Sequence, residues 1–366
     1  MKILFVLENY YPHIGGVETL FKNLAEALSK ENHEVFILTT LKNDGDERLE
    51  KNGNIIVHRK KYSNRYFFTF FAFFAAFRLS KSCDLIHTTS YNAAMPAWLA
   101  GKLRNKKIII TFHEVWGDLW FQLPFMSKFG ARLHHLFEQI LLRLHFYKFV
   151  GVSQYTQDAL IDNGVDPKQT TMIYNGIDYA EFSQDKHQPD SDQFTFTFFG
   201  RLGMSKGIEI YLQAIEVLIK SNVEAHFKLI IPTQPAPFLK EIQNIIDQLG
   251  IRENLIIKHN LLFTELKKEI AQSSAIVIPS YSEGFCFAAI ESMAIGTPII
   301  SSSKGALAEV ISGKYIEMEA LNSNALVRAM HKALRNDWQE TPFKKFKLKD
   351  TVDNYLSLYQ TIFKDK

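Results

Sequence analysis

The sequence has little cysteine, no long hydrophobic run and almost no net charge. Its 366 residues include two cysteines, Cys83 and Cys286, which lie far apart and in no metal-like spacing. Such sparse cysteine argues against a disulfide framework or a zinc site and predicts a reducing compartment, the cytoplasm. The formal net charge of +3 excludes no class of partner by itself, so the distribution of charge matters more.

The apolar segments are too short for a membrane span or a signal peptide. The N-terminal run Ile3–Leu7 is shorter than the roughly 7–15 residues of a signal h-region, and Glu8 follows it at once. The most apolar stretch, Tyr66–Phe77, falls well short of the ~20 residues that a spanning helix needs. We therefore expect neither a transmembrane helix nor a cleaved leader.

Short apolar runs alternate with helical patterns along the first half of the chain. A helix is expected over Val17–Ser29, where leucine and alanine recur at helical spacing. Near-continuous apolar strands between helices indicate a doubly wound α/β sheet, which binds ligands outside the carboxyl ends of its strands. The expected strands are Ile3–Leu7, Val35–Thr39, Ile55–His58, Leu85–Thr88, Ile108–Phe112 and Phe149–Val152.

The same pattern restarts after a polar, proline-containing segment, 183–193, which is the best linker candidate. The chain is also too long for one typical core, so two consecutive α/β domains are expected, over 1–182 and 194–345. A final helical pattern covers about 346–363. The strands expected in the second domain are Phe194–Phe199, Phe227–Ile231, Leu255–Lys258, Ala275–Pro279 and Pro298–Ser301.

Two glutamates, Glu283 and Glu291, flank the start of a helix predicted from about Phe285 to Ile295. At ~1.5 Å rise per residue their carboxylates lie roughly 10 Å apart along the axis. The free N–H groups of the first turn form an anion site, so a nucleotide diphosphate can lie there with ribose towards Glu291 and sugar towards Glu283. Either glutamate alone would more simply be a helix-start or solvated residue, but their shared context favours a donor site.

Two further loops carry candidate binding residues. Between a predicted strand and helix, Arg201 and Lys206 project from a loop flanked by glycines, and their charges suit a diphosphate, although the P-loop pattern is absent. Gly15 and Gly16 follow the first strand and allow close approach of a ligand, but they are not the GxGxxG of a nicotinamide site. His113 ends another strand at the same expected edge.

These segments, in this order, resemble the family 4 retaining glycosyltransferases of the GT-B fold. The resemblance covers almost the whole chain, and the glutamate pair joined to the GRLGMSKG loop is its most specific part. It implies two Rossmann-like doubly wound domains that face each other across a deep cleft, with a C-terminal helix (about 346–366) packing back on the first. The matching segments are GGVE, DLIH, TFHE, NGID, GRLGMSKG, EGFCFAAIE, GTPII and KGALAEVI.

The resemblance implies a role for each matching residue. Arg201 and Lys206 would bind the donor diphosphate and stabilise the leaving group in place of a metal, Glu291 the ribose, and Glu283 the sugar hydroxyls. His113 would face the sugar, and Gly16 would lie close to the reacting centre. The implied reaction is metal-independent, retaining transfer of a hexosyl group from a UDP- or GDP-linked sugar, with no cofactor. The donor-binding set also includes Gly284, Phe285, Cys286 and Phe287.

The sequence departs from the family pattern at two positions. Pro232–Pro235 stands where a Gly-x-Gly turn is common, so the resemblance does not assign the nucleotide base. Cys286 stands where glycine is frequent, which narrows the space beside the diphosphate.

Basic and aromatic residues gather between Lys51 and Lys107, where eleven Lys or Arg residues accompany one acid, Asp84. Within this segment, the phenylalanines of Tyr66–Phe77 occupy nearly every helical direction, whereas a helix covering a sheet needs an apolar stripe of about 100°. This pattern favours peripheral contact with the inner face of an anionic membrane rather than with nucleic acid. It also favours a glycan or lipid-linked acceptor. The alternative is a core helix buried by neighbours such as Trp116–Phe125.

The leading hypothesis is a transferase that builds a surface polysaccharide or similar glycoconjugate. A GT-B phosphorylase or a sugar-nucleotide epimerase would use the same cleft and remains the enzymatic alternative. A binding protein that has lost catalysis is disfavoured, because all the residues with implied roles are present.

Overall fold

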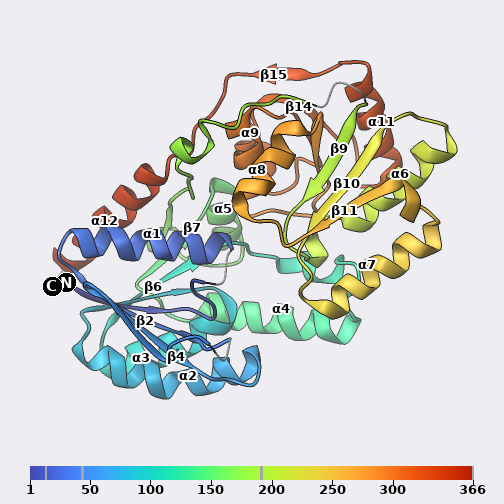
Figure 1. Ribbon diagram of the computed structural model, residues 1–366. Coiled ribbons are helices and arrows are strands. Elements are labelled where there is room, and N and C mark those ends of the chain that lie inside the picture. The colour runs from blue at the N-terminus through green and yellow to red at the C-terminus, as the bar shows by residue number, and fades with distance from the viewer. Residues whose placement is uncertain (13–14, 43–44, 190–192, 365–366) are drawn as a thin grey trace. The chain divides into compact units, whose positions relative to one another are not determined.

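The computed structural model describes residues 1–12, 15–42, 45–189 and 193–364, in which strands and helices alternate along the chain (Figure 1). The strands are β1 (Lys2–Val6), β2 (Glu34–Thr40), β3 (Leu49–Asn52), β4 (Ile55–Lys60), β5 (Leu85–Thr89), β6 (Lys107–Phe112), β7 (Lys148–Gly151), β8 (Thr170–Met172), β9 (Thr195–Phe199), β10 (His226–Ile231), β11 (Leu255–His259), β12 (Ala275–Ile278), β13 (Ile299–Ser301), β14 (Gly313–Glu317) and β15 (Gln339–Thr341). The helices are α1 (Gly16–Lys30), α2 (Arg65–Leu79), α3 (Ala94–Arg104), α4 (Lys128–Arg143), α5 (Gln154–Asp162), α6 (Ile208–Lys220), α7 (Ala236–Leu249), α8 (Phe263–Gln272), α9 (Phe287–Ile295), α10 (Leu307–Val310), α11 (Ser323–Leu334) and α12 (Leu348–Lys364).

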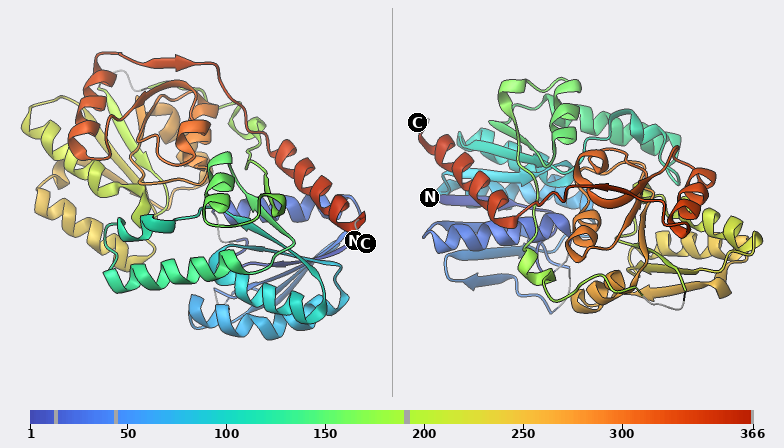
Figure 2. Two further views of the ribbon diagram at one scale, coloured as in Figure 1. Left: turned by 180° about the vertical axis from the view of Figure 1, so that it is seen from behind. Right: turned by 90° about the horizontal axis from the view of Figure 1, so that it is seen from above.

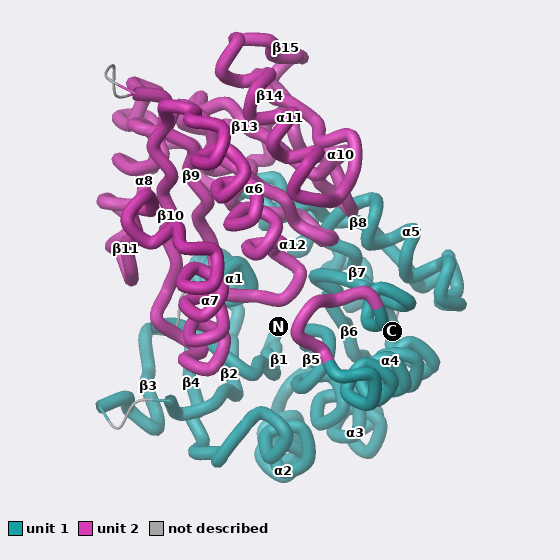
Figure 3. The backbone as a smooth tube through the Cα atoms, turned by 90° about the vertical axis from the view of Figure 1, so that its right-hand side faces the viewer, with its two compact units in different colours: residues 1–121, 127–176, 348–366 teal, residues 122–126, 177–347 magenta. Residues whose placement is uncertain are grey.

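The chain forms two compact units (Figure 3). Unit 1 contains 1–121, 127–176 and 348–366, and unit 2 contains 122–126 and 177–347. The first boundary therefore falls at 176/177, whereas the sequence places it at 182. The reason is local packing, because the 3₁₀ turn Tyr179–Phe182 contacts unit 2 through Phe182, whose ring centroid lies 5.6 Å from that of Phe263.

The polar segment 183–193 is not a free connection between the units. Its described residues, 183–189 and 193, belong to unit 2, and 190–192 lie outside the described residues. The backbone N–H of Ile177 donates to the carbonyl of Phe346 at 3.0 Å, and Ile177 also pairs with Lys347 as an isolated bridge. The two stretches that lead out of unit 2 at its ends therefore run side by side.

The sheet of unit 1 has the order β3-β4-β2-β1-β5-β6-β7-β8, and its pairs are parallel except β3 with β4. Because β2 lies on one side of β1 and β5 on the other, the strand order reverses beside β1. Ligands bind at such a switch point, outside the carboxyl ends of the strands. The carboxyl ends of β1 and β6, which precede Gly16 and His113, therefore share one edge of this sheet.

Both faces of this sheet are covered by helices, as the alternation of side chains along β1 shows. Ile3 and Phe5 pack in one apolar cluster with residues of α1 and α12, which lie next to each other (Figure 2). Leu4 and Val6 pack in the opposite cluster with residues of α2, α3 and α4. Covering on two faces explains why the strands read as near-continuous apolar runs.

The sheet of unit 2 has the order β11-β10-β9-β12-β13-β14-β15, with β15 antiparallel to β14. β9 pairs with β10 on one side and with β12 on the other, so the strand order reverses between β9 and β12. A single apolar cluster joins the sheet to α6, α7 and α11. The two loops that follow β9 and β12 therefore begin at neighbouring points on the ligand-binding edge.

A buried polar network anchors α12 to the sheet of unit 1. The imidazole of His87 on β5 contacts the hydroxyl of Tyr359 at 2.6 Å through Nδ1 and that of Thr111 at 2.8 Å through Nε2. Thr111 in turn contacts the hydroxyl of Tyr355 at 2.9 Å. Burial, helped by the nearby charge of His113, lowers the pKa of His87 to about 3, so the ring is neutral at pH 7.

We expect Tyr359→Phe to lower the unfolding free energy of unit 1 by about 1–3 kcal/mol, because it leaves Nδ1 of the buried His87 without its partner. Denaturant-dependent hydrogen exchange, resolved to peptides of unit 1, measures this quantity. Tyr66→Phe is the matched control, since Tyr66 is 57% exposed and should change stability by less than ~0.5 kcal/mol. Equal effects of the two substitutions would show that the network does not hold α12.

Candidate functional site

A lysine–glutamate pair with a buried carboxylate lies at the switch point of the unit 2 sheet. Lys206, in the loop after β9, donates to both carboxylate oxygens of Glu283, at 2.7 and 2.8 Å. Glu283 follows β12 and is 6% exposed. The pairing of β12 with β9 thus joins two residues that stand 77 positions apart in the sequence.

Short contacts between the two loops fix the geometry of this pair. The hydroxyl of Ser280 donates to Oε1 of Glu283 at 2.7 Å, and the N–H of Tyr281 donates to the carbonyl of Ser205 at 2.7 Å. Gly207 has a φ of +65°, and a Cβ atom there would stand 2.1 Å from the carbonyl oxygen of Pro279. Only glycine allows the loops to approach this closely.

A third loop, which the sequence did not assign to the site by residue, packs directly against Glu283. A Cβ atom on Gly305 would lie 2.5 Å from the carbonyl oxygen of Glu283, and the φ of Gly305 is +65°. The next residue, Ala306, donates its N–H to that same carbonyl at 2.8 Å. In the sequence, the glycine of the segment KGALAEVI could have indicated a close approach of two backbones, but only the structure shows that the second backbone is that of Glu283.

The electrostatics of the loops favour an anion. Burial alone would lower the pKa of Lys206, but the charge and hydrogen bonds of Glu283 outweigh it and raise that pKa, so the ammonium stays protonated. Arg201 is exposed in the same loop, and its charge acts on Lys206. Lys206 and Arg201 together outnumber the single charge of Glu283, which leaves an excess positive charge where a diphosphate can bind.

The helix after Glu283 begins two residues later than the sequence predicts. α9 starts at Phe287 because Cys286 takes a left-handed backbone conformation, with a φ of 76°. Gly284 and Phe285 are buried in the preceding turn, and the Phe285 ring packs against those of Phe287 and Phe346, with centroids 5.7 and 5.3 Å away. The backbone N–H of Phe285 therefore lies before the helix and is not one of the free N–H groups of its first turn.

Cys286 occupies a backbone conformation that costs a residue with a Cβ atom roughly 1–2 kcal/mol. Its thiol is buried, and burial raises the pKa of the thiol far above its usual range, so the sulfur is neutral. Glycine would be free of this cost, which explains physically why glycine suits the position.

Glu291 lies one turn into α9 and is partly buried. Desolvation, with a smaller contribution from the charge of Glu181, raises the pKa of the Glu291 carboxyl to about 8. A carboxyl that burial makes costly to ionise gains most from donors that reach it, such as a pair of hydroxyl groups.

The remaining predicted residues belong to unit 1. Gly16 is the first residue of α1, and His113 directly follows β6 and is half-buried. The strand order places both at the carboxyl edge of their sheet, as expected from the sequence. Arg201, Lys206, Glu283 and Glu291 belong to unit 2, so the predicted site residues are divided between the two units.

Family comparisons agree with this division of the chain. The model described as Glycosyltransferase Family 4 matches residues 14–181, and the model described as Glycosyl transferases group 1 matches residues 180–348. Together they span nearly the whole chain. The chain belongs to the family 4 glycosyltransferases of the GT-B fold.

Among the relatives of this glycosyltransferase is the alpha-monoglucosyldiacylglycerol synthase of Streptococcus pneumoniae, 25% identical over 91% of this chain and 78% of that protein. Among solved structures, the sucrose-phosphate synthase of Thermosynechococcus elongatus has a TM-score of 0.81 at 20% identity, covering 100% of this chain and 99% of that one. Anabaena HepE in complex with UDP-glucose has a TM-score of 0.77 at 17% identity, covering 99% of this chain and 100% of that one. At these identities the two structures show the shared fold.

In this glycosyltransferase the loop after β10 has no Gly-x-Gly turn, and a side chain from the neighbouring loop after β11 fixes its position. The N–H of Thr233 donates to Oδ1 of Asn260 at 3.1 Å, and Nδ2 of Asn260 donates to the Thr233 hydroxyl at 3.0 Å. Asn260 follows β11, the neighbouring strand. This loop is therefore positioned by side-chain hydrogen bonds rather than by glycine.

We expect the carboxyl of Glu291 to titrate near pH 8 and to destabilise the fold as pH rises. Between pH 4.5, the ordinary pKa of a glutamate, and about pH 8, its pKa in the folded protein, the folded state keeps a proton that the unfolded state has lost. The free energy of unfolding therefore falls as pH rises through this range. Carboxyl ¹³C NMR, with Glu291→Gln to assign the signal, measures the pKa directly.

Thermal unfolding provides the second readout for Glu291. Glu291→Gln should gain stability relative to the wild-type chain as pH rises from 5 to 9, whereas the exposed control Glu253→Gln should not. A Glu291 midpoint near pH 4.5 would contradict the desolvated environment.

Proposed function

We propose that this glycosyltransferase moves a sugar, with retention of anomeric configuration, from a UDP- or GDP-linked donor to a glycan or lipid-linked acceptor. The product would be a surface polysaccharide or a similar glycoconjugate. The observation that carries the proposal is the Lys206–Glu283 pair at the switch point of unit 2, with Arg201 in the same loop. The diphosphate gains negative charge as it leaves, and the cations Lys206 and Arg201 can stabilise that charge without a metal.

The donor-side residues would divide the work along the nucleotide sugar. Lys206, already held by Glu283, would place one N–H towards the diphosphate, and Arg201 would contact it from the exposed side of the loop. Glu283 would accept hydrogen bonds from the transferred sugar, and Glu291 from the ribose, while Gly284, Phe285, Cys286 and Phe287 would line the diphosphate with backbone. His113 and Gly16 would act on the sugar from unit 1.

The named relatives support the two substrates of this proposal. The Streptococcus relative is named as the synthase of a glucosylated diacylglycerol, which is a lipid-linked product. The Anabaena structure holds UDP-glucose, a nucleotide-sugar donor. A phosphorylase or a sugar-nucleotide epimerase on the same fold would be told apart by product analysis with and without inorganic phosphate.

We expect a nucleoside diphosphate to stabilise the protein and Lys206→Ala to abolish the effect. A thermal-shift screen of UDP, GDP, ADP and CDP tests this, since a ligand at 100 times its dissociation constant adds ~2.7 kcal/mol. Lys220→Ala is the matched control, because Lys220 lies on the surface of α6 in the same unit and pairs with Glu216. A screen without any shift, or a shift that survives Lys206→Ala, would contradict the proposed donor site.

A membrane-contacting surface on unit 1 is the second part of the proposal. α2 buries Phe68 and Ala72 against the sheet, yet Phe70 is 71% exposed and Phe74 is 68% exposed. The neighbouring residues Arg65 and Arg78 are exposed as well. Among the described residues, no helix is long and apolar enough to cross a membrane. The aromatic face of α2 consists of Tyr66, Phe67, Phe70, Phe71 and Phe74.

A second helix carries the same pattern, which the sequence did not single out. α4 exposes Phe129, Leu133, Leu136 and Ile140, at helical spacing, together with Arg132 and Arg143. Its one acid, Glu138, is fully buried. Because α2 and α4 pack on the same face of the sheet, both helices present aromatic or aliphatic side chains beside cations, as an anionic lipid surface requires.

We expect the protein to co-sediment with vesicles that contain anionic lipid and Phe70→Ser/Phe74→Ser to weaken this binding at least ~10-fold, since each ring loses its burial in lipid. Leu262→Ser in unit 2, where the side chain is 68% exposed, is the control and should bind as the wild type does. Binding that is independent of anionic lipid, or equal in all three proteins, would remove the membrane surface from the proposal.

A further inference from the structure

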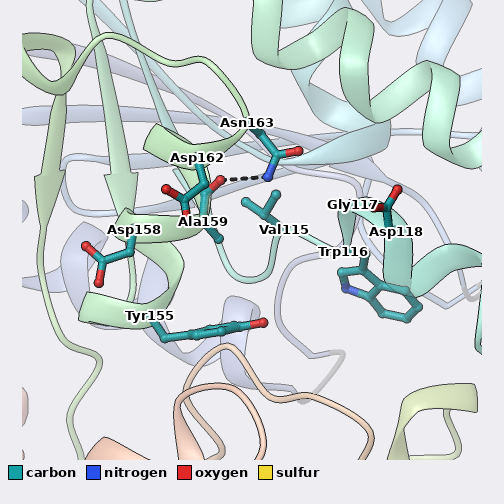
Figure 4. Close-up of a pocket in the computed structure, with 9 residues that line it drawn as sticks. All are labelled: Val115, Trp116, Gly117, Asp118, Tyr155, Asp158, Ala159, Asp162 and Asn163. Atoms are coloured by element: carbon teal, nitrogen blue, oxygen red, sulfur yellow. Dashed lines mark hydrogen bonds between the residues drawn. The ribbon is translucent and has the colours of Figure 1, made fainter.

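A cavity of about 400 Å³ lies entirely within unit 1, at the carboxyl edge of its sheet. The loop after β6 forms one side through Trp116 and Asp118, and α5, which follows β7, forms the other. Figure 4 shows the carboxylates of Asp158 and Asp162 on the α5 side, with the ring of Tyr155 between the two sides. A volume of this size is in the range of small-molecule sites.

The side of the cavity formed by the β6 loop is held rigidly by Glu138. This fully buried carboxylate on α4 accepts hydrogen bonds from the N–H groups of Trp116 and Gly117, at 2.9 and 2.7 Å. It also accepts from the hydroxyl of Tyr91 at 2.7 Å and the indole N–H of Trp120 at 3.2 Å. The indoles of Trp116 and Trp120 lie 4.5 Å apart. A loop tied to one carboxylate at three points presents Trp116 in a fixed position, which is how a preformed binding site is built.

The α5 side is set by helical spacing. Tyr155, Asp158 and Asp162 stand three and four residues apart, so they share one face of α5. Asn163, at the end of the helix, is fixed by the side chain of Gln139 on α4, which donates to it at 3.1 Å. Both sides of the cavity are thus attached to the same helix, α4.

The chemistry of the lining selects among ligands. Aromatic rings cover the apolar face of a sugar ring, and carboxylates accept hydrogen bonds from its hydroxyl groups. The cavity has three carboxylates and no Lys or Arg in its lining, so a phosphate or nucleotide would meet like charge there. Among the described residues, no group of three or more His, Cys, Asp and Glu side chains is placed to hold a metal ion.

We propose that this cavity is a saccharide subsite that binds a neutral or amino-bearing sugar ring of the acceptor. The inference rests on the proposed function, because it assigns the ring to the acceptor. It also specifies one part of the acceptor: the part that contacts Tyr155, Trp116 and the aspartates is an uncharged or cationic saccharide. Any phosphate of a lipid-linked acceptor must then lie outside this cavity.

Saturation-transfer difference NMR on the full chain tests the subsite. The probes are methyl glucoside, methyl galactoside, methyl mannoside, N-acetylglucosamine and glucosamine, with glucose 1-phosphate as the anionic probe. They are added with and without a saturating amount of the nucleoside diphosphate that gives the largest thermal shift. At least one neutral or amino-bearing probe should bind, glucose 1-phosphate should bind more weakly than the neutral probes, and the nucleotide should not compete.

Variants locate the binding. Asp158→Asn/Asp162→Asn should weaken saccharide binding about tenfold or more, because hydrogen bonds to charged acceptors are lost, and Tyr155→Ala should do the same. Asp350→Asn/Asp353→Asn, at two exposed positions of α12 in the same unit, is the charge-matched control and should bind as the wild type does. Lys206→Ala should lose the nucleotide and keep the saccharide.

The outcomes separate this inference from the proposed function. If nucleotide stabilises the chain but no saccharide binds, or if binding survives the aspartate and tyrosine variants, the subsite is wrong and the transferase proposal stands. If saccharide binds in the cavity but no nucleotide shifts the melting temperature, the donor site is wrong and the subsite stands as a sugar-binding site.

Discussion

The pairing of β12 with β9 is the constraint on which the loops at the switch point of unit 2 depend. It brings Glu283 to Lys206 across 77 positions of sequence and places both where the strand order reverses. A buried carboxylate is costly unless it is fully hydrogen-bonded, and here Lys206 and Ser280 supply that compensation. The close approaches at Gly207 and Gly305 follow from the same requirement, because the three loops must crowd around one carboxylate.

The two units place different charges around their candidate binding sites. Unit 2 pairs a buried carboxylate with Lys206 and places the exposed Arg201 in the same loop, which suits a ligand that carries negative charge. Unit 1 places carboxylates and aromatic rings around its cavity and exposes cations beside aromatic side chains on α2 and α4. The carboxylates of the unit 1 cavity would therefore repel an anionic donor, so electrostatics would oppose binding of the proposed donor in the proposed saccharide subsite.

Sequence patterns located the long buried strands to within one or two residues, because strands covered on both faces are almost entirely apolar. They missed β3, β8, β14 and β15, whose residues are few or polar. The loop lysine and the glutamate were identified by their motifs, but the left-handed Cys286, which delays α9, depends on the surrounding fold. Glu138 has no sequence signal at all, since only contacts with a loop about twenty residues earlier distinguish it from a solvated helix residue.

The return of α12 to unit 1 has a consequence for the order in which the chain folds. Tyr355 and Tyr359 belong to the core of the first sheet, yet they follow every strand of unit 2 in the chain. Every strand of unit 2 is synthesised before them, so the second unit has all its residues while the first still exposes the apolar groove that α12 fills. Although domains generally fold in N-to-C order during synthesis, here the later unit is complete first, and the nascent first unit must persist with an open core until α12 has been synthesised.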